Sequence, residues 1–207
     1  PAHAGSEPWL GVNALNGAQL ALHAVDMLRQ HVRPETRMAS YMVSGGTASN
    51  VVPAFAELEC CLRHTEKAYL EEVVEKVMNC IKGAALATGT KYEVVQWGNI
   101  FDDMNWNERG SQLLRSVMGN LGIAYETKRQ WDMGSSDIGS VSYRCPSFHP
   151  ELRMEGGPVP CHTKEFALKM KEPAIETTII KGAKIIGHAI VSLMENPSIL
   201  QEIRDEF

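Results

Sequence analysis

The sequence contains no apolar run approaching the roughly 20 residues that a membrane-spanning helix needs, and no basic stretch followed by an apolar signal segment at its start. We therefore expect no membrane anchor. Its 20 basic residues are outnumbered by 25 acidic ones, giving a formal net charge of −5, and they are scattered rather than clustered. A binding surface for phosphate backbones needs clustered positive charge, so we expect no nucleic-acid partner.

Cysteine is scarce, and its pattern excludes the common cysteine-based sites. The five cysteines form an odd set without any C-x-x-C spacing, in a chain large enough to form a core without disulfides: Cys60, Cys61, Cys80, Cys145 and Cys161. We expect free thiols in a reducing compartment, and therefore a cytoplasmic protein.

What is present is typical of a soluble globular protein with one large or two small domains. Of the 207 residues, 44% are hydrophobic and 22% are charged. The chain begins at Pro1 without an initiator methionine, and we expect it to have been cut from a longer polypeptide.

The first half has the apolar spacing of alternating helices and strands. Helices are predicted at residues 13–32 and 66–87, and strands at 36–43, 54–64 and 91–95. The order α-β-β-α-β is one strand short of a split βαβ sandwich, in which two helices cover a four-stranded antiparallel sheet. The absent strand would precede the first residue. Two strands would then lack a neighbour, which an upstream piece, a swapped strand or a rearrangement would have to supply.

A junction is predicted at residues 102–106, because the pattern changes after it. The second half predicts a helix at 108–121, a short strand near Tyr125, an irregular Gly/Ser/Pro-rich stretch at 133–160, and helices at 163–170 and 174–195. Long irregular stretches inside compact domains are often functional.

Several polar residues stand in loops or at element ends, where chemistry is often placed. They are His3, Asn50, Arg63, the turn at 134–137, His149 and His162. Taken singly, each also has an ordinary structural interpretation, such as a solvated histidine, a turn asparagine or a surface charge at a strand end.

Taken together, these residues lie in motifs whose order resembles the M20 metallopeptidases and amidohydrolases. The segment Gly45-Gly46-Thr47-Ala48-Ser49-Asn50-Val51-Val52-Pro53 is similar to that family's Gly-Gly-x-x-x-Asn-x-x-Pro signature, with Arg63 at the downstream arginine position. His3-Ala4-Gly5 is similar to the segment where the family's lid domain turns from its first strand into its first helix. Residues 134–142, 146–150 and 161–166 most resemble the branch that contains aminobenzoyl-glutamate hydrolase subunits and dipeptidases of the β-alanyl-lysine type.

The resemblance implies an α/β (α+β) fold with two domains. Residues 1–105 would form a ferredoxin-like lid and dimerisation domain, and residues 106–207 the C-terminal portion of a metallopeptidase catalytic domain. It also implies a homodimer formed through the lid. The activity would be hydrolysis of the amide bond of an N-acyl amino acid or dipeptide with a free carboxylate, using two divalent metals, zinc or manganese.

The resemblance also implies roles for individual residues. His162 would be a metal ligand, and His3 would donate a hydrogen bond to the oxyanion in the partner subunit's site. Asn50 and Arg63 would clamp the substrate carboxylate, while Gly134, Ser135 and Ser136 would offer backbone N–H groups. Asp137 receives no role, and His149 is expected to be structural or to support a metal ligand instead of being one.

The chain departs from the family in having no His-x-Asp pair and no Glu-Glu pair in the required upstream context; Glu71-Glu72 lies on a predicted helix of the lid. One imidazole cannot hold a hydrolytic metal, which takes three or more protein ligands. We therefore expect a fragment that is inactive alone. Two alternatives remain open, a stand-alone dimerisation or binding module without catalysis and one subunit of a two-chain hydrolase.

Overall fold

The computed structural model describes residues 1–126, 134–155 and 157–207. Contacts within the chain divide it into two compact units, Pro1–Asp103 and Met104–Phe207, called unit 1 and unit 2 below. This division falls inside the junction predicted at residues 102–106. Each unit is described by itself.

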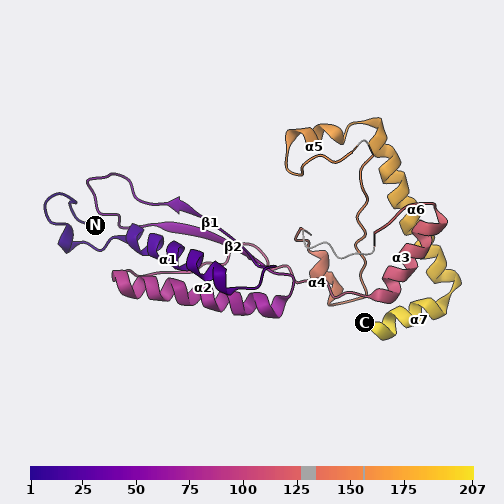
Figure 1. Ribbon diagram of the computed structural model, residues 1–207, viewed down its shortest axis with the longest axis horizontal. Coiled ribbons are helices and arrows are strands. Elements are labelled where there is room, and N and C mark those ends of the chain that lie inside the picture. Colours follow the sequence, from indigo (N-terminus) through magenta and orange to yellow (C-terminus); the bar gives the residue numbers. More distant parts are fainter. Residues whose placement is uncertain (127–133, 156) are drawn as a thin grey trace. The chain divides into compact units, whose positions relative to one another are not determined.

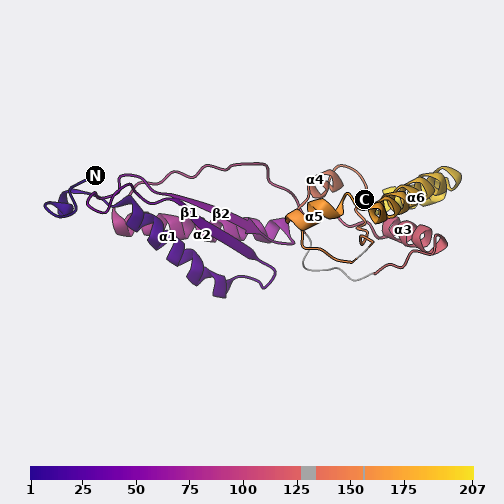
Figure 2. The same cartoon turned by 90° about the horizontal axis from the view of Figure 1, so that it is seen from above.

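Unit 1 combines two long helices with a two-stranded antiparallel sheet, an α+β arrangement (Figure 1). Its elements are η1 (Pro8–Leu10), α1 (Ala14–Leu28), η2 (Arg29–His31), β1 (Arg37–Ser44), β2 (Glu57–Arg63) and α2 (Lys67–Thr88). Both long helices lie on one side of the sheet (Figures 1 and 2).

Local chemistry sets the ends of these helices. The side chain of Asn13 accepts a hydrogen bond from the backbone N–H of Asn16 and so caps the start of α1. Gly89 ends α2 in the left-handed region at φ 68°, where glycine carries no Cβ penalty.

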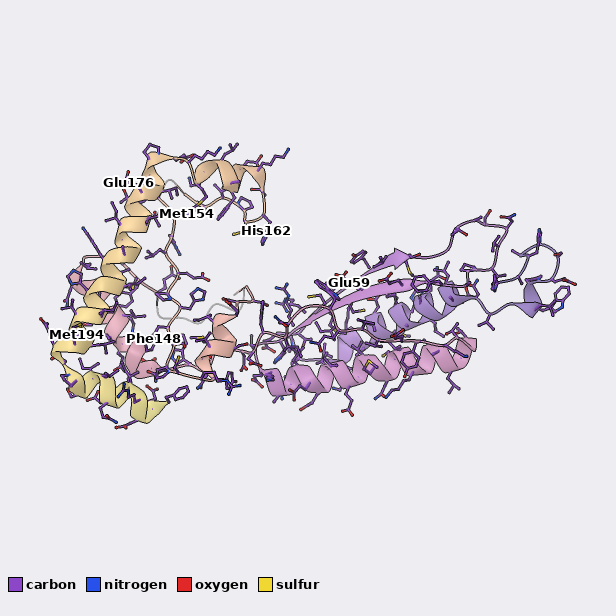
Figure 3. All side chains as sticks on the ribbon, turned by 180° about the vertical axis from the view of Figure 1, so that it is seen from behind. Glu59, Phe148, Met154, His162, Glu176 and Met194 are labelled. Atoms are coloured by element: carbon purple, nitrogen blue, oxygen red, sulfur yellow. The ribbon has the colours of Figure 1, made fainter. Side chains whose placement is uncertain are left out.

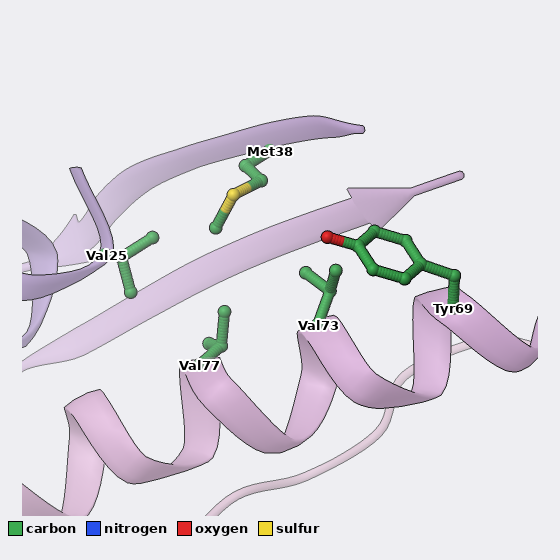
Figure 4. Packing of buried hydrophobic residues seen from close by; sticks show 5 residues of the cluster. All are labelled: Val25, Met38, Tyr69, Val73 and Val77. Carbon is green, nitrogen blue, oxygen red and sulfur yellow. The ribbon is translucent and has the colours of Figure 1, made fainter. Parts of the chain in front are cut away.

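The core of unit 1 lies between the helices and the sheet. Val73 is fully buried, and it packs in one cluster with Val25, Met38, Tyr69 and Val77 (Figure 4). Burial of such side chains stabilises the fold by about 1.5–3 kcal/mol each. Because successive strand residues face opposite sides, the burial of Met38 directs its strand neighbours to the face of the sheet away from the helices.

The strand predicted at residues 91–95 is wrong. These residues form no ladder with any described part of the chain. Among the described residues of unit 1, the sheet consists of β1 and β2, whereas the sequence predicts three strands. A strand needs a hydrogen-bonded neighbour, which sequence propensity alone does not supply. Residues 91–101 are exposed throughout, Val95 and Trp97 at 72% and 69%.

Unit 2 is helical in the part of the chain that the structure describes. Its helices are α3 (Glu108–Asn120), α4 (Ile138–Ser142), α5 (Lys164–Lys169), α6 (Pro173–Glu195) and α7 (Pro197–Glu206). A core cluster joins Val117 and Met118 of α3 to Ile185 and Ala189 of α6. The strand predicted near Tyr125 is not found at residues 123–126, and residues 127–133 lie outside the described range.

The start of α3 is held by α7. The carboxylate of Glu206 accepts the backbone N–H groups of Glu108 and Arg109 at 2.8 and 2.7 Å. The side chain of Asn107 caps Gly110 and donates to the carbonyl of Ile203 at 2.9 Å. These bonds satisfy donors that a helix leaves unpaired at its first turn.

Helix α6 is long and apolar enough to cross a membrane by length and composition alone, and only 11% of its most apolar window is buried within unit 2. Core helices of soluble proteins pass the same test, so this is weak evidence for a membrane span. The absence of a membrane anchor therefore stays a prediction. The predicted free thiols are confirmed, since all five cysteines are unpaired with one another.

Candidate functional site

The N-terminal segment and the loop between β1 and β2 are joined in unit 1. His3 and Val51 form an isolated antiparallel bridge. The N–H of Ala4 donates to the carbonyl of Asn50 at 2.9 Å, and the N–H of Val52 donates to the carbonyl of Ala2 at 2.9 Å. The structure therefore brings His3 and Asn50 together, although 46 residues separate them in the sequence.

The ring of His3 is oriented by its own turn. Its Nδ1 atom accepts the backbone N–H of Gly5 at 3.1 Å, so in the neutral imidazole the proton lies on Nε2. The side chain is exposed. His3 thus presents an N–H donor to whatever binds at this end of unit 1.

The loop around Asn50 is shaped by its glycines. Gly46 has φ 116°, and a Cβ at this position would come within 2.9 Å of the ring of Pro53. Residues of this loop, together with Asn13 and Leu15, line a shallow pocket of about 420 Å³. Asn50 itself is exposed beside that pocket.

Arg63 lies at the opposite end of the sheet. It ends β2, and its partner across the ladder is Arg37, the first residue of β1. A strand of seven residues spans about 20 Å. Within one copy of the chain, the structure therefore does not bring Asn50 and Arg63 together as the predicted clamp.

Arg37 lies in none of the motifs that the sequence resembles. Its position opposite Arg63 depends on the register of the ladder, which the sequence pattern does not state. In the sequence, Met38 and Met42 alternate with Arg37 and Tyr41, and this spacing of two is the signal that could have placed Arg37 on the face away from the core.

In unit 2, His162 precedes α5 and is exposed (Figure 3). It is the one non-glycine residue with positive φ, 63°, among those that the structure describes. Such a conformation is costly for a residue with a Cβ atom and is found at functional sites more often than elsewhere.

The residues after His162 hold it in place. The hydroxyl of Thr163 donates to the carbonyl of Pro160 at 2.9 Å and accepts the N–H of Phe166 at 3.1 Å, which caps α5. Imidazole is a common zinc ligand. Over the described ranges, however, no group of three or more histidine, cysteine, aspartate or glutamate side chains could hold a metal.

The turn at residues 134–137 directly precedes α4. Buried Ser142 at the end of α4 accepts the N–H of Asn105 at 2.8 Å and donates to the carbonyl of Gly139 at 2.5 Å. Gly134 and Ser135 are exposed and Ser136 is half-buried. Asp137 is near the hydroxyl of Ser136, at 3.4 Å, and this geometry assigns it no further role.

Two contacts fix the irregular stretch between α4 and α5. Phe148 packs against Gly110 of α3, while the neighbouring His149 is exposed. Glu155 accepts a hydrogen bond from the amino group of Lys181 on α6. This bond, together with the positive charge of Lys181, lowers the pKa of Glu155 below its ordinary value of 4.5.

The α+β arrangement of unit 1 agrees with the family that its sequence matches. Residues 1–88 match the M20 peptidase dimerisation domain. They are therefore an M20 dimerisation domain, and the chain is homologous to hydrolases of the M20 type.

Two relatives match almost the whole chain. The Xaa-Arg dipeptidase of Homo sapiens is 29% identical over 99% of this chain and 48% of its own length, and that of Mus musculus is 28% identical over the same shares. One of the p-aminobenzoyl-glutamate hydrolase subunits of Escherichia coli is 33% identical over 44% of this chain and 19% of its own length. The chain thus spans about half the length of the dipeptidases that it matches.

Proposed function

We propose that this chain is part of a metal-dependent amidohydrolase or dipeptidase that cleaves the amide bond of a dipeptide or N-acyl amino acid with a free carboxylate. The observation that carries the proposal is the hydrogen bond of the exposed His3, whose Nδ1 accepts the N–H of Gly5, so that its neutral ring keeps an Nε2–H donor in the M20 dimerisation domain. Similarity to two dipeptidases along 99% of the chain supports it.

His3 donates this N–H to the oxygen of the scissile carbonyl as negative charge develops there. Such a donor acts mainly on the transition state, so its loss lowers kcat more than it raises KM. Asn50, held beside His3 through the backbone, adds an amide donor at the same end of unit 1.

Arg63 binds the free carboxylate, because a guanidinium matches the geometry of a carboxylate with two parallel hydrogen bonds. Within one copy, however, Arg63 and His3 are separated by the length of β2, whereas two fully extended residues span at most about 7 Å. We infer that one substrate meets His3 and Asn50 of one copy and Arg63 of another. A homodimer formed through the dimerisation domain is then required for activity.

Unit 2 contributes binding groups of a different kind. The backbone N–H groups of Gly134, Ser135 and Ser136 face the substrate, and His162 supplies one neutral imidazole ligand to zinc or manganese. The metal, when bound, polarises the carbonyl and acidifies water. The other ligands come from outside this chain, and the 207-residue chain alone is inactive. Its free thiols support a cytoplasmic location.

A complementation experiment in the parent protein tests the arrangement. His3→Ala lowers kcat and Arg63→Gln raises KM, so each homodimer is less active than the wild type at substrate concentrations below KM. When the two variants are co-expressed, a mixed dimer contains one site with both wild-type residues, because His3 comes from one copy and Arg63 from the other. We expect each mixed dimer to regain about half of the wild-type activity.

The control is a mixture of His3→Ala with Asn50→Ala. Both residues belong to the same end of unit 1, so a mixed dimer has one defective residue in each site and gains no intact site. Failure of the first mixture to regain activity in verified mixed dimers would contradict the two-copy arrangement. Full activity of the His3→Ala homodimer would contradict the role of His3.

The second candidate is one subunit of a two-chain hydrolase. The observation that favours it is the similarity to p-aminobenzoyl-glutamate hydrolase subunits from two bacteria. In that case the 207-residue chain becomes active with zinc or manganese when a separate polypeptide with the remaining ligands is added. A chain that only dimerises, under all these conditions, would instead be a binding module.

A further inference from the structure

Two arginines face each other across the sheet of unit 1. Arg37 and Arg63 are direct partners in the antiparallel ladder of β1 and β2, and both are exposed. The next pair along the ladder, Met38 and Leu62, belongs to the core between sheet and helices. Since side chains alternate along a strand, the two arginines lie on the opposite, open face.

This pairing is unfavourable unless another group offsets it. Like charges directly opposite each other in a ladder destabilise a sheet, and their Cβ atoms are only about 4.5–5.5 Å apart. Over the described part of the chain, no ion pair joins a carboxylate to Arg37 or Arg63.

Acidic residues near the two arginines in the sequence do not form ion pairs with them. Glu66, just after β2, pairs with Arg33 at 2.8 Å. Glu59 accepts a hydrogen bond from the hydroxyl of Tyr41 at 3.1 Å, and it lies four residues along β2 from Arg63, about 13 Å away. Glu35, two residues before Arg37, forms no ion pair with it.

The guanidinium of Arg37 is already oriented. Its Nη1 atom donates to the carbonyls of Pro34 and Thr36 at 2.7 and 3.3 Å. These bonds hold the group without neutralising its charge and leave donors on Nε and Nη2. Arg63 has no side-chain hydrogen bond within the described residues, so all of its donors are available.

We propose that Arg37 and Arg63 together form a binding site for one carboxylate group. The inference rests on the proposed function, in which Arg63 binds the substrate carboxylate, and it adds Arg37 as the second binding residue from the same copy. A carboxylate has two oxygen atoms, so it can accept hydrogen bonds from both guanidinium groups and offset their repulsion.

The next pair on the same face leaves room for the rest of such a ligand. Ala39 and Cys61 are partners in the ladder, and both side chains are small. The site therefore has room for a carboxylate that is attached to a larger molecule, such as an N-acyl amino acid.

Binding of N-acetylglycine to the full 207-residue chain tests the proposal. N-acetylglycinamide, in which an uncharged carboxamide replaces the carboxylate, is the neutral probe of matched size. Titrations by NMR at low ionic strength limit the screening of exposed charges. We expect the chain to bind the acid and not the amide.

Four variants test whether Arg37 and Arg63 bind the carboxylate. Arg37→Gln and Arg63→Gln should each weaken binding of N-acetylglycine about two- to fivefold, which is the upper part of the range for exposed ion pairs. Arg37→Lys keeps the charge and should fall between Arg37→Gln and the wild type. Arg153→Gln removes an exposed arginine from unit 2 and should leave the dissociation constant unchanged. Circular dichroism verifies that each variant is folded.

The outcomes separate the two proposals. If Arg37→Gln binds as tightly as Arg153→Gln while Arg63→Gln is weakened, the inference on Arg37 is overturned and the role of Arg63 stands. If both arginine variants bind as the wild type does, both are overturned. Equal binding of acid and amide overturns the pair as a carboxylate site. Should Arg37→Gln fail to fold, wild-type affinity in Arg37→Lys overturns the need for the guanidinium group.

Discussion

Gly110 of α3 lies directly against the ring of Phe148, so that a Cβ atom added to this glycine would overlap the ring carbons. The contact fastens the irregular stretch after α4 to the core helix of unit 2. It also gives a physical reason for a glycine inside a helix, where it is normally unfavourable.

Gly110→Ala should therefore destabilise unit 2 by about 1–3 kcal/mol, because the phenyl ring must move out of its packed position. Gly119→Ala is the matched control in the same helix. Nothing lies within 4 Å of a Cβ at Gly119, so the alanine should stabilise by about 0.5–1 kcal/mol. Urea unfolding followed by circular dichroism measures both. Equal effects of the two substitutions would contradict the Phe148 contact.

His162 should be less favourable for stability than glycine would be at the same position. With φ at 63°, any residue with a Cβ atom pays about 1–2 kcal/mol, so His162→Gly should be more stable than His162→Ala by roughly 1 kcal/mol. Both variants lack the imidazole, and both should lower the metal content of the parent protein. Metal analysis and thermal unfolding together test this. A His162→Ala protein as stable as His162→Gly would show that the backbone relaxes.

The ion pair of Glu155 with Lys181 predicts part of the acid sensitivity of unit 2. Because the hydrogen bond and charge of Lys181 lower the pKa of Glu155 from 4.5, the unfolded chain binds more protons than the folded chain as the pH falls through this region. The stabilisation is thus present above the ordinary pKa and is lost as the pH falls through the lowered value.

Glu155→Gln should accordingly reduce the loss of stability between about pH 6 and pH 3, measured from urea midpoints at a series of pH values. Glu195→Gln removes a carboxylate from the end of α6 that forms no ion pair in the described chain. It should keep the wild-type pH dependence. If both variants respond alike, Glu155 does not contribute specifically.

The sequence predicted the long helices well because their signals are local. The apolar spacing at 66–87 and 174–195 corresponds to α2 and α6 within one residue at each end. The predicted strand at 91–95 is wrong because these residues have no ladder partner in the described part of the chain, and local propensity does not supply one. Helix α7 was missed because Pro197 at its start resembles a break, although proline is favoured in a first helical turn.

For the candidate site, too, the sequence predicted local features but not the contacts between distant residues. Motif spacing identified His3, Asn50, Arg63 and His162 as single positions. The resemblance paired Asn50 with Arg63, whereas within one copy the structure joins Asn50 to His3 and Arg63 to Arg37. The bridge of His3 to Val51 and the register of Arg63 with Arg37 are non-local pairings, which motif spacing does not predict. The tautomer of His3 likewise depends on a bond that only the folded turn provides.

The bonds from Glu206 to the first turn of α3 bear on the synthesis of the protein. They join residues 97 and 98 positions apart, so the two ends of this unit meet only after α7 has left the ribosome. The pairing in unit 1 is complete much earlier, since His3 needs only the loop at Val51. During translation, unit 1 can therefore fold while unit 2 is still unfolded. A chaperone or a protease that acts at this stage would bind unit 2.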